Sequence, residues 1–157
     1  MRNVIALILC LFINNTAQTQ NYWQQNADYK INVDVNANNN TYKGNQEIKY
    51  TNNSRDTLNK IFFHLYFNAF KVGSDMAVRL KNGDDINTRF DVDISQLKPN
   101  EEGFLKVSNL RQDGLKVETY VSDTILEVIL ANPLEPGDSS IFTCLLYTSD
   151  AADDCWS

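Results

Sequence analysis

Few residues of this chain have the side chains and spacing that catalysis or metal binding requires. His64 is the only histidine among 157 residues, and a zinc site usually takes several histidine, cysteine or carboxylate ligands. Because His64 lies in an apolar, aromatic run, we predict a core histidine that is hydrogen-bonded to a neighbour. The sequence has no nucleophile elbow and no glycine-rich phosphate loop. We therefore assign no catalytic, cofactor-binding or metal-binding residue to this chain.

A cluster of aspartates is the second candidate for ligand chemistry. Oxygen ligands at alternating positions suit a hard cation such as calcium. The cluster lacks the glycine and the terminal glutamate of an EF-hand loop, so a solvated loop is the preferred interpretation. Its members are Asp84, Asp85, Asp91 and Asp93.

Aromatic residues and two sequons are the remaining candidates. The aromatic residues, together with residues 124–130, have the composition of a ligand groove, but core packing of a strand explains them more simply. Glycosylation sequons begin at Asn39 and Asn52, and two matches are expected by chance in an asparagine-rich chain. The aromatic set is Phe62, Tyr66, Phe67 and Phe70.

The elements that must position these residues are predicted from apolar periodicity. Residues 29–35 alternate strictly, with Ile31, Val33 and Val35 on one face, which is typical of a half-solvated strand. A polar turn, residues 36–41, joins them to a second strand, residues 42–52, in a hairpin. Residues 58–70 are so apolar and aromatic that they predict a central strand buried on both faces. Leu65 and Phe67 would then face the same side of the core.

The rest of the chain predicts a long polar region and four more strands. Residues 71–102 contain only short apolar islands, which indicates a functional loop or short elements over a sheet edge. Strand patterns follow at 103–107, 115–121, 124–130 and 139–143. Tight turns are predicted between them at residues 112–114, 122–123 and 135–138. This spacing favours an all-β fold, either an antiparallel β-sandwich or a curved sheet, and we expect it to be incomplete at its carboxy end.

The amino-terminal residues 1–17 predict a secretory signal peptide. Arg2 precedes an apolar run over residues 4–13, and Ala17 is a suitable small residue for cleavage. The run is about half the roughly 20 residues that a membrane-spanning helix needs. We expect export to the periplasm or the extracellular space, with no transmembrane segment after cleavage. Lipidation at Cys10 is the weaker alternative because the preceding Leu9 is bulky.

The carboxy-terminal residues 144–157 look foreign to the domain. They resemble the translation of a transposase-type sequencing adapter joined to a broken reading frame, so we expect a partial β-domain over residues 18–143 followed by a non-native tail. A genuine, frayed acidic terminus is the alternative. If the tail is foreign, the last strand has an open edge, and we expect aggregation or loose packing.

Net charge and cysteine content exclude some classes of function. A net charge of −6 offers no electrostatic footprint for nucleic acid, so we expect no nucleic-acid partner. Cys10, Cys144 and Cys155 all lie in the two terminal segments. A cysteine-free exported core fits a large secreted enzyme better than a small disulfide-stapled module.

Several segments carry a family resemblance. The run Ile-Phe-Phe-His-Leu-Tyr-Phe-Asn-Ala-Phe over residues 61–70 is the most specific, and Tyr-Trp-Gln-Gln (22–25), Tyr-Lys-Gly (42–44) and Tyr-Thr-Asn-Asn-Ser (50–54) support it. Ile-Ser-Gln-Leu (94–97), Pro99, Glu101 and Gly103 look like the family's loop after the central strand. Across residues 21–143 the chain resembles the amino-terminal β-domain of secreted, Bacteroidetes-type aminopeptidase N-like zinc metallopeptidases, the gluzincins.

This resemblance implies the non-catalytic front domain of an exported aminopeptidase. In that family a separate domain holds zinc through a His-Glu-x-x-His helix and a distant glutamate, and the zinc activates water. Neither that motif nor Gly-x-Met-Glu-Asn occurs here, so zinc, peptide substrates and the catalytic domain as a partner belong to a part of the polypeptide that is missing here. The alternative is a free-standing cell-surface binding or adhesion module without enzymatic activity.

Overall fold

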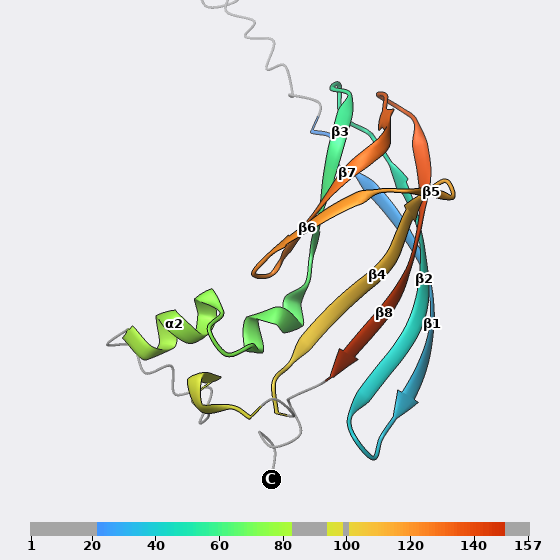
Figure 1. Ribbon diagram of the computed structural model, residues 1–157. Helices are drawn as coiled ribbons and strands as arrows, with labels where there is room; N and C mark the ends of the chain where they lie inside the picture. The colour runs from blue at the N-terminus through green and yellow to red at the C-terminus, as the bar shows by residue number, and fades with distance from the viewer. Residues whose placement is uncertain (1–21, 83–93, 99–100, 150–157) are drawn as a thin grey trace, which may run out of the picture.

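The computed structural model describes residues 22–82, 94–98 and 101–149. Antiparallel strands form a large sheet in the order β1-β2-β8-β4-β5 and a small sheet in the order β3-β7-β6, and the small sheet lies over one end of the large one (Figure 1). The predicted all-β antiparallel fold is confirmed. The strands are β1 (Asn26–Asn36), β2 (Thr41–Thr51), β3 (Leu58–His64), β4 (Phe104–Gln112), β5 (Leu115–Lys116), β6 (Glu118–Ser122), β7 (Ile125–Leu134) and β8 (Ser139–Ser149).

Three short helical segments, η1 (Tyr66–Phe70), α2 (Asp75–Asn82) and η2 (Ile94–Gln96), lie between β3 and β4. Buried Asn68 fastens η1 to both sheets, because its Oδ1 accepts from the Leu105 amide at 3.0 Å and its Nδ2 donates to the Asp123 carbonyl at 3.1 Å. Ser74 Oγ accepts from the Ala77 amide at 3.1 Å and so caps α2. Within the described ranges, no helix is long and apolar enough to cross a membrane.

The hairpin of β1 and β2 matches the sequence prediction. The two strands pair without a register shift from Asn26 opposite Thr51 to Asn36 opposite Thr41. Asn40 closes the turn with a φ of 49°, a left-handed conformation that asparagine tolerates. Strict alternation in β1 was therefore a reliable guide to both the strand and its pairing.

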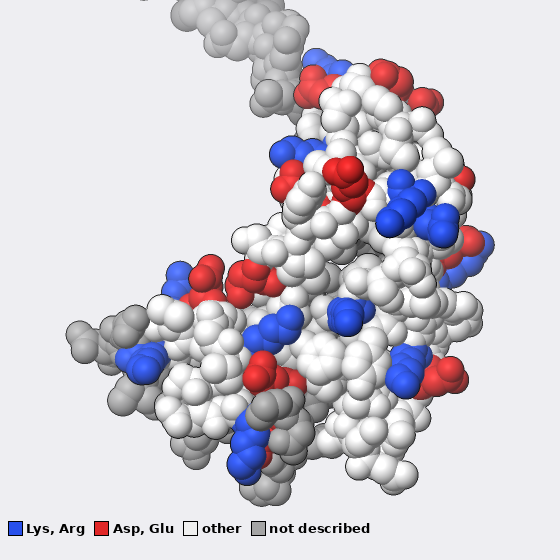
Figure 2. Space-filling model, in the orientation of Figure 1, with Lys and Arg blue, Asp and Glu red and all other residues white. Residues whose placement is uncertain are grey.

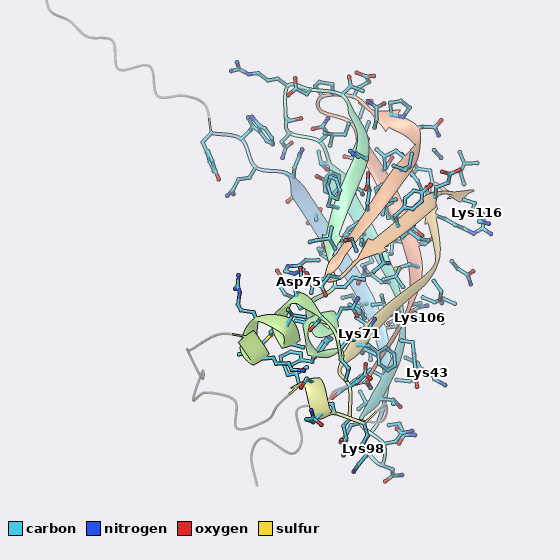
Figure 3. All side chains as sticks on the ribbon, turned by 60° about the vertical axis from the view of Figure 1, so that its left-hand side comes forward. Lys43, Lys71, Asp75, Lys98, Lys106 and Lys116 are labelled. Atoms are coloured by element: carbon cyan, nitrogen blue, oxygen red, sulfur yellow. The ribbon has the colours of Figure 1, made fainter. Side chains whose placement is uncertain are left out.

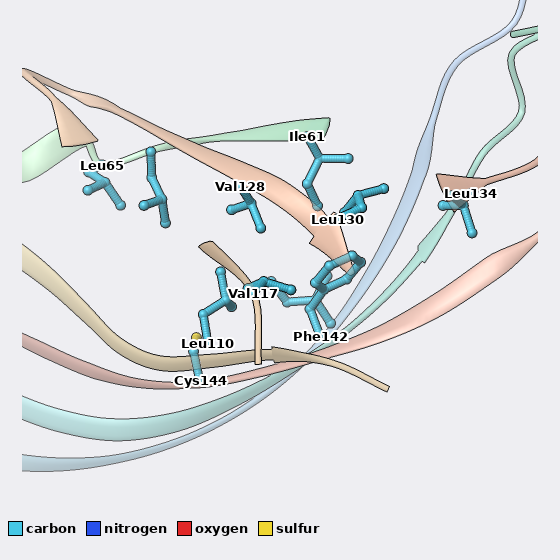
Figure 4. Close-up of a cluster of buried hydrophobic side chains, with 11 residues drawn as sticks. Ile61, Leu65, Leu110, Val117, Val128, Leu130, Leu134, Phe142 and Cys144 are labelled. Atoms are coloured by element: carbon cyan, nitrogen blue, oxygen red, sulfur yellow. The ribbon is translucent and has the colours of Figure 1, made fainter. Parts of the chain in front are cut away.

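The core lies between the two sheets. Figure 4 shows Phe142 and Cys144 projecting from the large sheet toward Val128 on the small sheet. Phe142 and Val128 are completely buried, and Ile48 is 1% exposed. Opposing buried faces of two antiparallel sheets are the arrangement of a β-sandwich. The other core members are Ile61, Leu65, Leu110, Val117, Leu126, Leu130 and Leu134.

The predicted central strand over residues 58–70 is wrong. Strand β3 ends at His64, lies at the edge of the small sheet, and is followed by the 3-10 helix η1. Ile61 is 3% exposed, whereas Phe62 is 57% exposed, so only one face is buried. Leu65 is buried as predicted, but Phe67 lies half-buried in η1 and does not share a strand with it. Buried and exposed side chains therefore alternate along β3, as in an ordinary strand with one buried face. The alternation was not visible in the sequence because residues on both faces are aromatic or apolar.

The last strand extends past its predicted end. Strand β8 continues through Cys144 to Ser149 and pairs with β2 on one side and β4 on the other. The expectation of an open edge along this strand is therefore wrong, and the predicted boundary at residue 143 falls inside a paired strand. The adapter origin of the tail stays a prediction, and residues 150–157 lie outside the described residues.

Two further predictions also fall outside the described residues. These are the signal peptide over residues 1–17, including Cys10, and the aspartate cluster at Asp84, Asp85, Asp91 and Asp93. Both stay predictions.

Candidate functional site

An apolar stripe along β1 is the main candidate for a binding surface. Tyr29 lies opposite Ile48 in the β1–β2 ladder, and residues opposite one another in an antiparallel pair share a face. The odd-numbered side chains of β1 therefore point to the core side of the large sheet. We call Tyr29, Ile31, Val33 and Val35 the open apolar face, because they are 53%, 49%, 47% and 62% exposed.

The open apolar face is uncovered because the two sheets differ in extent. Strand β1 has 11 residues and β3 has 7, and the small sheet covers only the end of the large sheet that is remote from the β1–β2 turn (Figure 1). Gly44 of β2 lies opposite Val33 and opposite Leu146 of β8. A Cβ at Gly44 would come within 2.5 Å of the Asn32 carbonyl oxygen, so a side chain is not tolerated there. The face is consequently shallow at its centre.

A cleft of about 270 Å³ adjoins this face between the two sheets. Its walls come from β3, β7 and η1 on one side and from β2, β4 and β8 on the other, with Tyr29 at the β1 end. Most of its lining is apolar, and its polar members include Gln46 and Cys144. Gln46 Nε2 and Cys144 Sγ lie 3.9 Å apart, which is a weak sulfur contact. The cleft and the open apolar face together form a surface suited to apolar contacts.

The predicted core position of His64 is wrong. Its side chain is exposed at the end of β3 and contacts the ring of Tyr66, with 3.9 Å between the ring centroids. Side chains alternate between the two faces of a strand, and in β3 Ile61 and Phe63 point toward the core. His64 therefore points to the outer face. Among the described residues, no group of three histidine, cysteine or acidic residues is placed to hold a metal ion.

The aromatic candidates were interpreted either as a ligand groove or as core packing, and the structure gives a different answer for different residues. Phe62 and Tyr66 are 57% and 70% exposed, so core packing does not explain them. Phe67 and Phe70 are half-buried. From residues 124–130, by contrast, the side chains of Leu126, Val128 and Leu130 are buried in the core, as the packing interpretation predicts.

The two sequons differ in accessibility. Asn39 lies exposed in the β1–β2 turn, where its Oδ1 accepts from Thr41 Oγ1 at 2.7 Å. Asn52 is completely buried and its side chain is held by several hydrogen bonds. A glycan on Asn52 is therefore incompatible with the folded domain, which the sequence motif alone did not reveal.

The thiol of Cys144 is expected to react slowly in the folded protein. Burial raises its pKa from 9.0 to about 11, so the reactive thiolate is scarcer than in the unfolded chain. At pH 8 we expect alkylation by iodoacetamide to be about 100-fold slower in buffer than in denaturant, because each pKa unit lowers the thiolate fraction tenfold. Mass spectrometry of the Cys144 peptide measures both rates. Equal rates would show that the thiol is exposed.

The opposite side of the large sheet is mixed, with lysines beside the exposed Leu145. Lys43, Tyr147 and Lys106 lie side by side on β2, β8 and β4, and Lys43 Nζ lies 5.5 Å from the centre of the Tyr147 ring. Figure 3 shows Lys43 and Lys106 on the side of the sheet away from α2. Blue and red side chains are interspersed over the side of the molecule drawn in Figure 2. The absence of a nucleic-acid partner stays a prediction.

Comparisons with known proteins were made by sequence and by structure. No protein-family model matches the chain, and no curated protein sequence matches it. Among solved structures, an M1 zinc metallopeptidase from Deinococcus radiodurans has 15% sequence identity, a TM-score of 0.48, and an alignment over 78% of this chain and 20% of its own.

Two related structures give similar values. A mutant of a two-domain M1 zinc metallopeptidase bound to L-tryptophan has 15% identity and a TM-score of 0.48, with 80% of this chain and 21% of that chain aligned. A mutant bound to L-arginine has 16% identity and a TM-score of 0.46, with 78% and 20% aligned. The chain thus spans about a fifth of the length of the structures that it matches.

Proposed function

We propose that this chain is a non-catalytic β-domain that packs through the open apolar face against the zinc-peptidase domain of the same polypeptide. The observation that carries the proposal is the stripe of four large apolar side chains left exposed along β1. A contiguous apolar patch of this kind marks an interaction surface. A neighbouring domain joined by the same chain meets such a face at high effective concentration.

The sequence supports the choice of neighbour. The segments that resemble gluzincin β-domains form defined parts of the fold, since residues 61–70 make the end of β3 and all of η1, and residues 42–44 lie in β2. We infer that the whole polypeptide is an exported aminopeptidase, located in the periplasm or outside the cell, that removes amino-terminal residues from peptides. Zinc and the catalytic glutamate would belong to the neighbouring domain, because this chain has one histidine.

The proposal predicts a face-specific loss of docking. The chain and the natural downstream sequence, produced as separate proteins, should bind each other, and Ile31→Lys or Val33→Lys should weaken binding by about tenfold or more, because each buries a charge in an apolar contact. Asn32→Lys is the matched control, since it lies between them on the polar side of β1, and it should change affinity by less than about twofold. Isothermal titration calorimetry measures the affinities.

Two results would contradict the proposal. One is a downstream sequence without a His-Glu-x-x-His motif, and that result would favour the free-standing binding module. The other is an equal effect of Ile31→Lys and Asn32→Lys, which would show that docking does not use the open apolar face.

A further inference from the structure

The outer edge of β1 is the longest free strand edge in the described part of the chain. Strand β1 is first in the order of the large sheet and pairs only with β2, so its other side has backbone N–H and C=O groups without a strand partner. The strand has 11 residues and pairs with β2 without a bulge. A long, regular, unblocked edge is a template for another strand.

The geometry points to a second copy of this chain as the occupant of that edge. We propose that two copies pair through antiparallel β1 strands around a two-fold axis at Asn32, which joins their large sheets into one continuous sheet. Two-fold dimers are the commonest symmetric assembly, and they require a surface that is complementary to itself. The sequence of β1 meets this requirement in one register.

With the axis at Asn32, Lys30 of each copy lies opposite Asp34 of the other. Both side chains are exposed and both lie on the polar side of β1. Lys30 Nζ is 3.0 Å from Glu47 Oε1, and Asp34 makes no ion pair with any described residue. Asp34 already lies opposite Lys43 in the β1–β2 ladder, and the pairing places a second cation, Lys30 of the other copy, on its free side, twice per dimer. Oppositely charged cross-strand pairs are stabilising.

The same register matches the apolar side. Ile31 of one copy lies opposite Val33 of the other, and Tyr29 lies opposite Val35, so all four members of the open apolar face find an apolar neighbour. Cross-strand aromatic and β-branched pairs are among those that stabilise antiparallel sheets. The polar and apolar sides of β1 thus favour one and the same axis.

Other positions of the axis fit less well. An axis at Ile31 places Asp28 opposite Asp34, and an axis at Lys30 places that lysine opposite itself. An axis at Tyr29 pairs Lys30 with Asp28 but leaves Val33 and Val35 beyond the paired region. An axis at Val33 leaves Lys30 opposite Asn36. Like charges directly opposite each other are destabilising, which disfavours the axes at Ile31 and Lys30. The axis at Tyr29 loses apolar pairs, and the axis at Val33 leaves Lys30 without an acidic partner.

The pairing uses the edge of β1, whereas the proposed docking to a peptidase domain uses the face of the sheet. Substitutions at Lys30 and Asp34 lie on the polar side and leave the open apolar face intact. Failure of the dimer would therefore leave the docking proposal standing, and failure of docking would leave the dimer standing.

A charge-reversal experiment on the full chain tests the proposal. Lys30→Glu places two acids opposite each other at each end of the paired strands, and Asp34→Lys places two lysines there. Each variant alone should dimerise roughly tenfold or more weakly than the wild-type chain, because two attractive pairs become repulsive. An equimolar mixture should recover dimers, because each Lys30→Glu copy matches an Asp34→Lys copy at both pairs. Analytical ultracentrifugation measures the monomer–dimer equilibrium.

The mixture separates dimer pairing from effects within one copy. Each substitution also places like charges across the β1–β2 hairpin, at Glu47 or at Lys43, but mixing leaves those contacts unchanged. Recovery on mixing therefore reports pairing between copies alone. A wild-type chain that stays monomeric, variants that dimerise as well as the wild type, or a mixture that behaves as its two components would each overturn the proposal.

A crosslink provides a second test that does not depend on charge. In a chain with Cys10→Ser and Cys155→Ser, Asn32→Cys places one thiol from each copy at the axis, and copper-catalysed oxidation should give a covalent dimer. Asp28→Cys is the matched control, because it lies opposite Asn36 of the second copy and should crosslink at least roughly tenfold less. Equal crosslinking of the two variants would contradict the register.

Discussion

Replacing Phe142 with alanine is expected to lower the free energy of unfolding by about 3 to 5 kcal/mol. Phe142 is completely buried and lies on β8 at the centre of the large sheet. Its ring makes edge contacts with Tyr50, at 6.4 Å and 89°, and with Phe63 of the small sheet, at 6.3 Å and 71°. Alanine would therefore remove contacts between the sheets and leave a cavity. Urea denaturation followed by circular dichroism measures the change.

Phe62→Ala provides the control within the same residue type. Phe62 is 57% exposed on the outer face of β3, so its removal should change the free energy of unfolding by less than about 1 kcal/mol. Phe142→Leu should fall between the two, because leucine refills part of the volume. Equal losses for Phe142→Ala and Phe62→Ala would mean that the two sheets do not meet at Phe142.

Local patterns in the sequence were sufficient for the hairpin of β1 and β2. Alternation through residues 29–35 and an asparagine-rich turn both act over a few residues, and the structure confirms the strands and the turn. The turn at Asp113 and Gly114 was predicted for the same reason, and both residues have positive φ angles of 48° and 83°. Features that depend on neighbours in sequence were therefore predictable.

The end of β3 was not predictable from local patterns. Residues 61–70 have the composition of one long strand, yet tertiary hydrogen bonds redirect the chain after His64. The Leu65 amide donates to the Thr124 carbonyl at 2.7 Å, and Asn68 bonds to residues 105 and 123. These contacts join segments far apart in sequence, so the preference of aromatic residues for strands was overridden.

The open apolar face was predicted as a face but not as an exposed one. Ile31, Val33 and Val35 were correctly placed on one side of the strand, and sequence periodicity cannot state whether a second sheet reaches that side. The answer depends on the length of β3 and on the position of the small sheet over the large one. The exposure of His64 has the same origin, since it follows from the edge position of β3.

Replacing Asn52 with alanine is expected to cost about 3 to 5 kcal/mol of stability, although the change is small in volume. Asn52 is completely buried. Its Nδ2 donates to the carbonyls of Asp56 at 2.8 Å and Leu134 at 2.9 Å. Its Oδ1 accepts from the Ser54 amide at 3.0 Å, from Ser54 Oγ at 2.6 Å and from Gln25 Nε2 at 3.1 Å. Alanine would leave several of these groups unsatisfied, and urea denaturation measures the loss.

Asn53→Ala separates this network from a general effect on the loop. Asn53 is the exposed neighbour, and its side chain makes a hydrogen bond to the Gln24 carbonyl at 2.8 Å, so its loss should stay below about 1 kcal/mol. The difference arises because water can replace an exposed hydrogen bond but cannot reach the carbonyl of Leu134 in the interior. If Asn52→Ala proves as mild as Asn53→Ala, the loop is hydrated, and Asn52 does not hold the end of β7 to the loop after β2.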